Sequence, residues 1–158
     1  MEWEVLVEPP LIHWRMWRVR LRPPFLIVRQ GQSFWVEAHA PEHCSATLQA
    51  FRDGCYSGAW CYDATGGEWP IINATLKERP TLLQRSFPWK RVAVELHLGL
   101  RVEADLAAAI SRIAEVLRSD NEFCQGLRTP PAEVLRQFES ARTTADLIQI
   151  ARRWQRAG

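Results

Sequence analysis

Imidazole and thiol groups are the most reactive side chains of this sequence, and several of them occur close together. The group consists of His39, His43, Cys44, Cys55 and Cys61. Imidazole and thiolate are the preferred protein ligands of zinc, but zinc sites usually have paired ligands at short, regular spacing. These five residues lack that spacing. We therefore predict no metal site and no bound cofactor, with the cysteines as buried free thiols.

A cysteine nucleophile would need a base within hydrogen-bond reach. His43 directly precedes Cys44, but neighbours on a helix point about 100° apart, so this adjacency does not make a dyad. His13, His39 and His97 are further candidates for the base. A small cysteine-dependent enzyme is accordingly the third of our functional hypotheses.

Arginines and a tryptophan alternate with other residues between positions 13 and 22. One face of an extended segment there would carry Trp14, Arg18, Arg20 and Arg22. Arginine can pair with phosphates and tryptophan can stack on bases, so a nucleic-acid-binding module is the alternative hypothesis. The same pattern is typical of the wet face of a half-buried strand. The formal net charge of +2 adds no global field that would attract nucleic acid, an acidic partner or an anionic membrane.

The stretch from Phe51 to Ile72 predicts a β-hairpin. Gly58 to Tyr62 is rich in aromatic residues, the sequence DATGG from Asp63 has turn chemistry, and Trp69 to Ile72 forms the returning strand. Pro70 has no backbone donor, so the returning strand should lie at a sheet edge or carry a bulge there. We expect an accessible edge at this hairpin.

The same region carries a family resemblance. A short helix, then Phe51-Arg52-Asp53-Gly54, an aromatic strand, the turn Asp63 to Gly67 with Glu68 and Trp69, and a returning strand together resemble small bacterial immunity proteins. Such proteins neutralise polymorphic or contact-delivered toxins, and the similarity covers about residues 41–72. It implies a cytoplasmic, non-enzymatic inhibitor that binds one cognate toxin domain and occludes its active site. Immunity proteins against nucleases tend to be acidic, which this chain is not.

Our leading hypothesis is therefore a protein-binding module, specifically an immunity-type inhibitor and not an enzyme. Eight tryptophans are more than one small sheet requires, and tryptophan, tyrosine and arginine are enriched at protein interfaces. The predicted contact residues are Trp60, Tyr62, Asp63, Glu68 and Trp69. The aromatic side chains would be anchors, and the carboxylates would pair with basic groups of the partner.

The rest of the chain predicts an α+β domain over residues 1–158, strand-rich in 1–98 and helical in 100–157. Strands are expected at 3–8, 13–22, 25–29, 33–38 and 89–98, with a short internal helix between Pro41 and Gly54 and irregular structure over 73–88. Apolar residues at helical spacing predict helices at about 102–118, after Pro130-Pro131, and after a cap at Thr143 or Thr144. We expect a mainly antiparallel sheet with about three C-terminal helices packed on one face.

The start of the chain, Met1-Glu2-Trp3-Glu4-Val5, lacks the basic and apolar regions of a secretory signal, and no apolar run is long enough to span a membrane. We therefore expect a cytoplasmic protein with no membrane partner. The sequence leaves the oligomeric state open.

Overall fold

A computed structural model describes residues 20–157, which form one antiparallel sheet with helices at the C-terminal end. The predicted α+β class is confirmed. The strands are β1 (Phe25–Arg29), β2 (Ser33–Glu37), β3 (Cys44–Thr47), β4 (Ala59–Tyr62), β5 (Gly67–Leu76), β6 (Arg91–Leu98) and β7 (Val102–Glu103). The helices are η1 (Pro41–His43, a 3-10 turn), α2 (Leu48–Arg52), α3 (Leu82–Ser86), α4 (Leu106–Arg118), α5 (Glu122–Gln125), α6 (Pro131–Glu139) and α7 (Thr144–Ala157).

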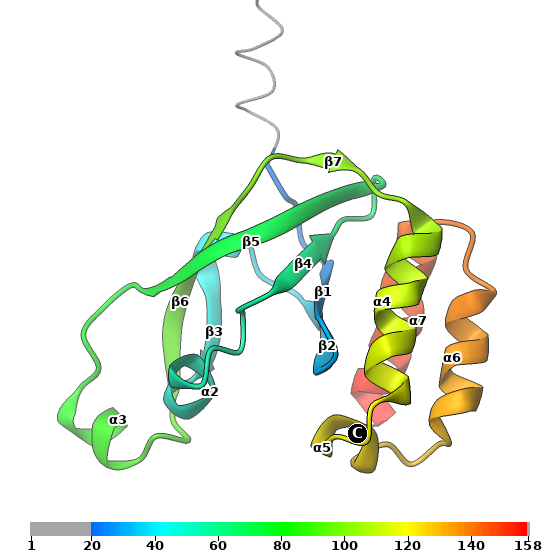
Figure 1. Cartoon of the computed structure of the whole chain (residues 1–158). Helices are drawn as coiled ribbons and strands as arrows, with labels where there is room; N and C mark the ends of the chain where they lie inside the picture. The colour runs from blue at the N-terminus through cyan, green and yellow to red at the C-terminus, as the bar shows by residue number, and fades with distance from the viewer. Residues whose placement is uncertain (1–19, 158) are drawn as a thin grey trace, which may run out of the picture.

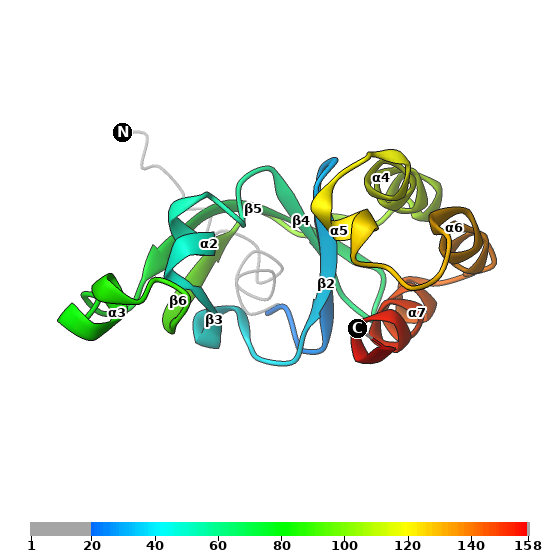
Figure 2. The same ribbon diagram turned by 90° about the horizontal axis from the view of Figure 1, so that it is seen from below.

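The sheet has the strand order β2-β1-β4-β5-β6-β3, with β7 paired to β5. It curls so strongly that β3 and β6 face β1 and β4 across an open roll (Figures 1 and 2). Alternation along each strand therefore gives the roll an inner and an outer face.

The inner face forms one hydrophobic core. On β1 the inward residues are Phe25 and Ile27, and on β4 they are Ala59 and Cys61. The opposite wall contributes side chains from β3 and β6, and Trp69 of β5 closes the core.

The outer face of β1, β2 and β4 forms a second core against α4, α6 and α7 (Figure 2). Leu26 and Val28 of β1 point outward, between the inward residues of the same strand. On α4 the apolar stripe buries Ile113 and Leu117, which the sequence spacing predicted. The expected packing of the C-terminal helices on one face of the sheet is confirmed.

Some boundaries differ from the prediction for local reasons. The helix expected from Pro41 begins only at Leu48, because Cys44–Thr47 pairs with β6 and Thr47 then caps α2 by accepting a hydrogen bond from Ala50 N at 3.1 Å. The irregular stretch expected over 73–88 contains the end of β5 and the whole of α3, and α5 was not predicted at all. The helix expected from about Val102 starts at Leu106, after the Asp105 cap.

The N-terminal expectations are mostly outside the described residues. The strand predicted over 3–8 lies wholly there, as does 13–19 of the strand predicted over 13–22. Arg20, Leu21 and Arg22 are described and are not in a strand, so that part of the prediction is wrong.

The central hairpin is present as β4 and β5, but the accessible edge expected for it is not. β5 pairs with β4 on one side and with β6 and β7 on the other, so it lies inside the sheet. The sequence predicted either a sheet edge or a bulge near Pro70, and the structure has a bulge between Ile71 and Asn73.

Side chains close part of each actual edge strand. On β2 the Val36 N–H donates to Gln155 Oε1 at 2.8 Å, and Gln155 Nε2 donates to the Val36 carbonyl at 3.3 Å. On β3 the Ser45 carbonyl accepts from Arg91 Nη2 at 2.7 Å and from the Tyr56 hydroxyl at 3.4 Å. Since an unpaired edge is a template for adding another strand, these contacts disfavour strand addition.

Within residues 20–157, no helix has the length and apolar character needed to cross a bilayer.

The amide of Gln155 leads to a testable prediction about the β2 edge. Replacing Gln155→Ala should lower the free energy of unfolding by about 1 kcal/mol, since two hydrogen bonds to Val36 are lost. The Val36 amide should also exchange its hydrogen faster. Gln149→Ala on the exposed face of the same helix is the matched control and should leave Val36 exchange unchanged. Equal exchange rates in both variants would contradict this role for Gln155.

Candidate functional site

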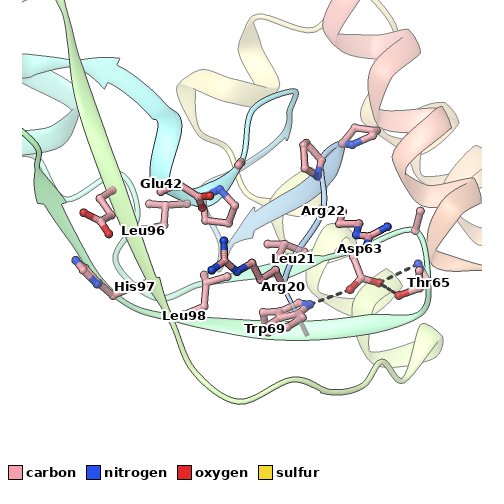
Figure 3. Close-up of a pocket in the computed structure, with 16 residues that line it drawn as sticks. Arg20, Leu21, Arg22, Glu42, Asp63, Thr65, Trp69, Leu96, His97 and Leu98 are labelled. Carbon is pink, nitrogen blue, oxygen red and sulfur yellow. Dashed lines mark hydrogen bonds between the residues drawn. The ribbon is translucent and has the colours of Figure 1, made fainter. Parts of the chain in front are cut away.

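The turn between β4 and β5 is built around the buried carboxylate of Asp63. Its Oδ1 accepts hydrogen bonds from Thr65 N at 2.9 Å, Thr65 Oγ1 at 2.7 Å and Gly67 N at 2.8 Å. Its Oδ2 accepts from Trp69 Nε1 at 2.9 Å (Figure 3). The Asp63 carbonyl accepts from the Thr144 hydroxyl at 2.6 Å, which joins the turn to the start of α7. The carboxylate is therefore a structural acceptor whose hydrogen-bonding capacity is largely used.

These contacts also determine the ionisation of Asp63. Burial alone would raise the pKa of this carboxyl, but hydrogen bonds from Thr65, Trp69 and Gly67 stabilise the charged form more strongly, so the pKa is lowered. Arg101 Nε lies 3.9 Å from Oδ2 and adds a positive charge nearby. Asp63 is therefore ionised at neutral pH.

Three other predicted contact residues meet on the opposite face of the same hairpin. Arg112 of α4 donates to both the Tyr62 hydroxyl and Glu68 Oε1, and its guanidinium carbon lies 3.9 Å from the centroid of the Trp60 ring. Tyr62 is completely buried. This cluster ties α4 to the sheet through an ion pair, a hydrogen bond and a cation–π contact.

The structure thus divides the predicted contact residues between two interior positions. Asp63 and Trp69 lie on the inner side, while Trp60, Tyr62 and Glu68 lie under α4. Only 5% of Asp63 and 6% of Trp69 is exposed. Tyr62 and Trp69, two of the aromatic residues predicted as anchors, are buried because the hairpin is central in the sheet. Whether any of these residues affects partner binding stays a prediction.

A cleft of about 1120 Å³ opens beside the Asp63 turn (Figure 3). Arg20 and Arg22, two of the predicted nucleic-acid contacts, are exposed at its wall and flank the buried Leu21. The carboxylates of Glu42 and Glu95 also line it, so its charge is mixed. Trp14 and Arg18 lie outside the described residues. The cleft does not select for a polyanion, and the nucleic-acid hypothesis remains a prediction.

Burial favours the protonated form of two of the thiols, Cys44 and Cys61. Burial and the nearby carboxylates of Glu37 and Glu42 together raise the pKa of the Cys44 thiol to about 12, so this thiol stays protonated at neutral pH. Burial also raises the pKa of Cys61 well above its usual value. His43 is exposed and approaches Lys77 Nζ at 3.3 Å. In the described part of the chain, no three His, Cys, Asp or Glu side chains are arranged to hold a metal ion.

Three exposed apolar side chains lie where β5 pairs with the end of β6 and with β7. We call Ile72, Leu100 and Val102 the outer strip, because all three are large, apolar and exposed. Val102 is opposite Glu68 in the β5–β7 pair, and Ile72 is the extra residue of the β5 bulge. Gly99 brings the two segments together: its N–H donates to the Pro70 carbonyl at 2.8 Å, and an added Cβ would lie 2.6 Å from Pro70 Cγ.

Charged pairs occur close to the outer strip along the chain. Arg101 Nη1 donates to Glu103 Oε1 at 3.1 Å, and the Arg112–Glu68 pair lies under the adjoining end of α4. An apolar centre with a charged margin is the usual anatomy of a protein interface. The outer strip is therefore the best candidate for a binding surface near the predicted hairpin site.

Sequence reasoning missed both Arg112 and the outer strip. Arg112 occupies an ordinary polar position between Ile110 and Ile113, and nothing in the sequence indicates which strand it faces. The sequence predicts Ile72 as part of the returning strand, and Pro70 is the only sequence signal for the bulge that contains Ile72. Leu100 and Val102 do show a signal, since they alternate with the charged residues Arg101 and Glu103.

Comparison of the chain with models of protein families, with curated proteins and with solved structures gives no match.

The Asp63 turn should determine how stability depends on pH. Asp63→Asn should lower the free energy of unfolding by about 2 kcal/mol at pH 7, because an amide cannot accept all four hydrogen bonds. The folded-state pKa of Asp63 lies below the unfolded value of about 3.9. Its contribution is therefore complete above that value and is lost as pH falls through the folded pKa.

Chemical denaturation of the two proteins between pH 7 and pH 3 measures this effect. The stability difference between wild type and Asp63→Asn should shrink toward the acid end. Asp120→Asn, at an exposed position, is the control and should show little difference at either pH. A difference that stays constant down to pH 3 would show that the charge of Asp63 is not what stabilises the turn.

Proposed function

We propose that this protein is a non-enzymatic protein-binding module, and specifically a cytoplasmic immunity-type inhibitor that occludes a cognate toxin domain. The observation that carries the proposal is the outer strip. The exposed fraction is 72% for Ile72, in β5, and 82% for Leu100, in the short segment between β6 and β7. Neighbouring strands pair at both ends of this segment, and exposed apolar side chains held in this way are suited to a partner that buries them.

The position of the outer strip supports occlusion by a layer of the partner. The strip continues the same sheet face that α4 covers at Glu68 and Tyr62, so a helix or strand of the toxin could extend the helical layer across it. The resemblance to immunity proteins in residues 41–72 ends at Ile72, which is a member of the strip. An inhibitor of this kind would therefore bind its toxin next to the hairpin, through the residues of the outer strip.

The chemistry of the interior supports a role without catalysis. The side chains of Arg112, Tyr62 and Glu68 hydrogen-bond to one another and hold α4 against the sheet. The Asp63 carboxylate is similarly occupied by the turn. The polar atoms of both groups are already engaged in contacts within the fold, so these contacts support a binding role.

The outer strip can be tested by substitution at exposed positions. Tagged wild-type protein and the Ile72→Ser/Leu100→Ser variant are used for parallel pull-downs from nuclease-treated extract of the source cell, with bound proteins identified by mass spectrometry. The wild type should retain one stoichiometric protein that contains a toxin domain. The variant should bind it at least about ten-fold more weakly, because central apolar contacts dominate interface energy.

Leu82→Ser/Leu83→Ser, which changes two exposed leucines on α3, is the matched control for loss of surface apolarity. Titration calorimetry with the purified partner then gives both affinities. Equal affinity of the wild type and the outer-strip variant would remove this surface from the interface. Retention of only nucleic acid would instead favour the arginine hypothesis.

A further inference from the structure

The segment from Lys77 to Lys90 projects away from the rest of the fold. It connects β5 to β6 and carries α3, which lies at the far end of the molecule from α4, α6 and α7 in both views (Figures 1 and 2). We call residues 77–90 the α3 excursion. The excursion contains no residue of the outer strip, so the role of each surface can be tested independently.

The α3 excursion is held in a defined conformation. At its base, Leu48 N donates to the Lys90 carbonyl at 3.0 Å and Gln49 N donates to the Pro88 carbonyl at 2.8 Å. At its tip, Thr81 and Gln84 form a reciprocal capping box at the start of α3. The side chains of the excursion are therefore displayed on an ordered support.

That support displays apolar side chains to solvent. The excursion carries four exposed large apolar residues, Leu82, Leu83, Phe87 and Trp89. The exposed fraction reaches 75% for Leu82 and 66% for Trp89. The rings of Phe87 and Trp89 pack edge to face with centroids 4.9 Å apart, so the two aromatics form one unit. These side chains add little to either core of the protein.

The excursion also concentrates positive charge. It contains four basic residues and one acidic residue, Glu78, so its net charge is +3, whereas the whole chain has +2 and the remainder has −1. The basic residues are Lys77, Arg79, Arg85 and Lys90, and all four are exposed. Both lysines of the chain are in this set, one at each end of the excursion. Among the described residues, none of the four forms an ion pair.

We propose that the α3 excursion docks this protein on an anionic lipid bilayer. Leu82, Leu83 and Trp89 enter the headgroup and upper acyl region, where leucine and tryptophan are favourable. The surrounding cations lie against the acidic headgroups, and the long lysine stems let the charge stay in water while the apolar tip inserts. The excursion attaches to one leaflet and does not span the membrane.

The composition of the surface favours a bilayer over a protein as the occupant. Lysine is depleted at protein interfaces, and the excursion contains both lysines of the chain. Membrane-surface segments instead combine leucine and aromatic residues with lysine and arginine. The outward projection also allows contact with a flat surface without hindrance from the helices (Figure 1). Whole-chain charge did not indicate this contact, because the remainder of the chain offsets the excursion.

Vesicle flotation with the full chain tests the proposal. The probes are large unilamellar vesicles of phosphatidylcholine alone, and the same vesicles with about 30% phosphatidylserine. Binding should be much stronger to the anionic vesicles and should fall steeply when salt is raised from about 0.1 M to about 1 M. Replacing Leu82→Ser/Leu83→Ser or Trp89→Ser should weaken binding by about ten-fold or more.

Charge variants test the electrostatic component. Neutralising the excursion with Lys77→Gln, Arg79→Gln, Arg85→Gln and Lys90→Gln should lower binding by about five-fold per residue. A matched control neutralises exposed arginines elsewhere, namely Arg52→Gln, Arg118→Gln, Arg136→Gln and Arg152→Gln. Ile72→Ser/Leu100→Ser is the apolar control. Both controls should bind anionic vesicles much better than the matching excursion variants, and amide hydrogen exchange verifies that every variant is folded.

Three results would overturn the proposal. One is the absence of binding to anionic vesicles at low salt. Another is equal binding to neutral and anionic vesicles, and the third is binding that the excursion variants do not weaken. If vesicles do not bind but an acidic protein does, and the same variants abolish its binding, the excursion belongs to a protein interface instead. None of these results would alter the test of the outer strip, because that test measures a protein partner with different substitutions.

Discussion

The fold depends on the buried carboxylate of Asp63. An ionised group in a protein interior is costly unless its oxygens are satisfied by hydrogen bonds, and here the donors come from Thr65, Gly67 and Trp69. Satisfying the carboxylate fixes the turn, which in turn sets the register of β4 against β5. The bond from Thr144 to the Asp63 carbonyl extends this constraint to α7. One residue thus joins the hairpin, the inner core and the helical layer.

The register set by this turn determines what each hairpin residue can do. Because strand side chains alternate, Trp69 enters the inner core, whereas Tyr62 and Glu68 face α4. Arg112 of α4 can then donate hydrogen bonds to both Tyr62 and Glu68. These contacts are a second connection between the sheet and the helices. Residue types that are common in binding sites are used here for assembly. Surfaces available to partners must therefore lie at residues outside the Asp63 turn and the Arg112 contacts.

Local sequence patterns predicted the elements well where one periodicity dominated. The stripe of α4, the Pro130-Pro131 start of α6 and the alternation of β6 all appear as expected. The pattern misled where two signals overlapped: Leu48 and Phe51 belong to α2, but the preceding Cys44–Thr47 is held extended by β6, a partner far along the chain. The burial of two predicted contact residues has a related cause. Exposure of Tyr62 and Trp69 depends on which strands and helices flank the hairpin, and a single sequence does not specify those neighbours.

The two exposed apolar surfaces differ in electrostatic character, and this difference separates their proposed roles. Close to the outer strip along the chain are the pairs Arg101–Glu103 and Arg112–Glu68, in which each cation has an anionic partner of its own. The α3 excursion has a net charge of +3, and none of its cations forms an ion pair within residues 20–157. Paired charges give orientation and specificity at short range, whereas unpaired charges of one sign attract an extended anionic surface over about 10 Å. A strip suited to one defined protein and an excursion suited to a lipid surface can therefore coexist on one small domain. Their separation along the sheet allows both to be engaged at the same time.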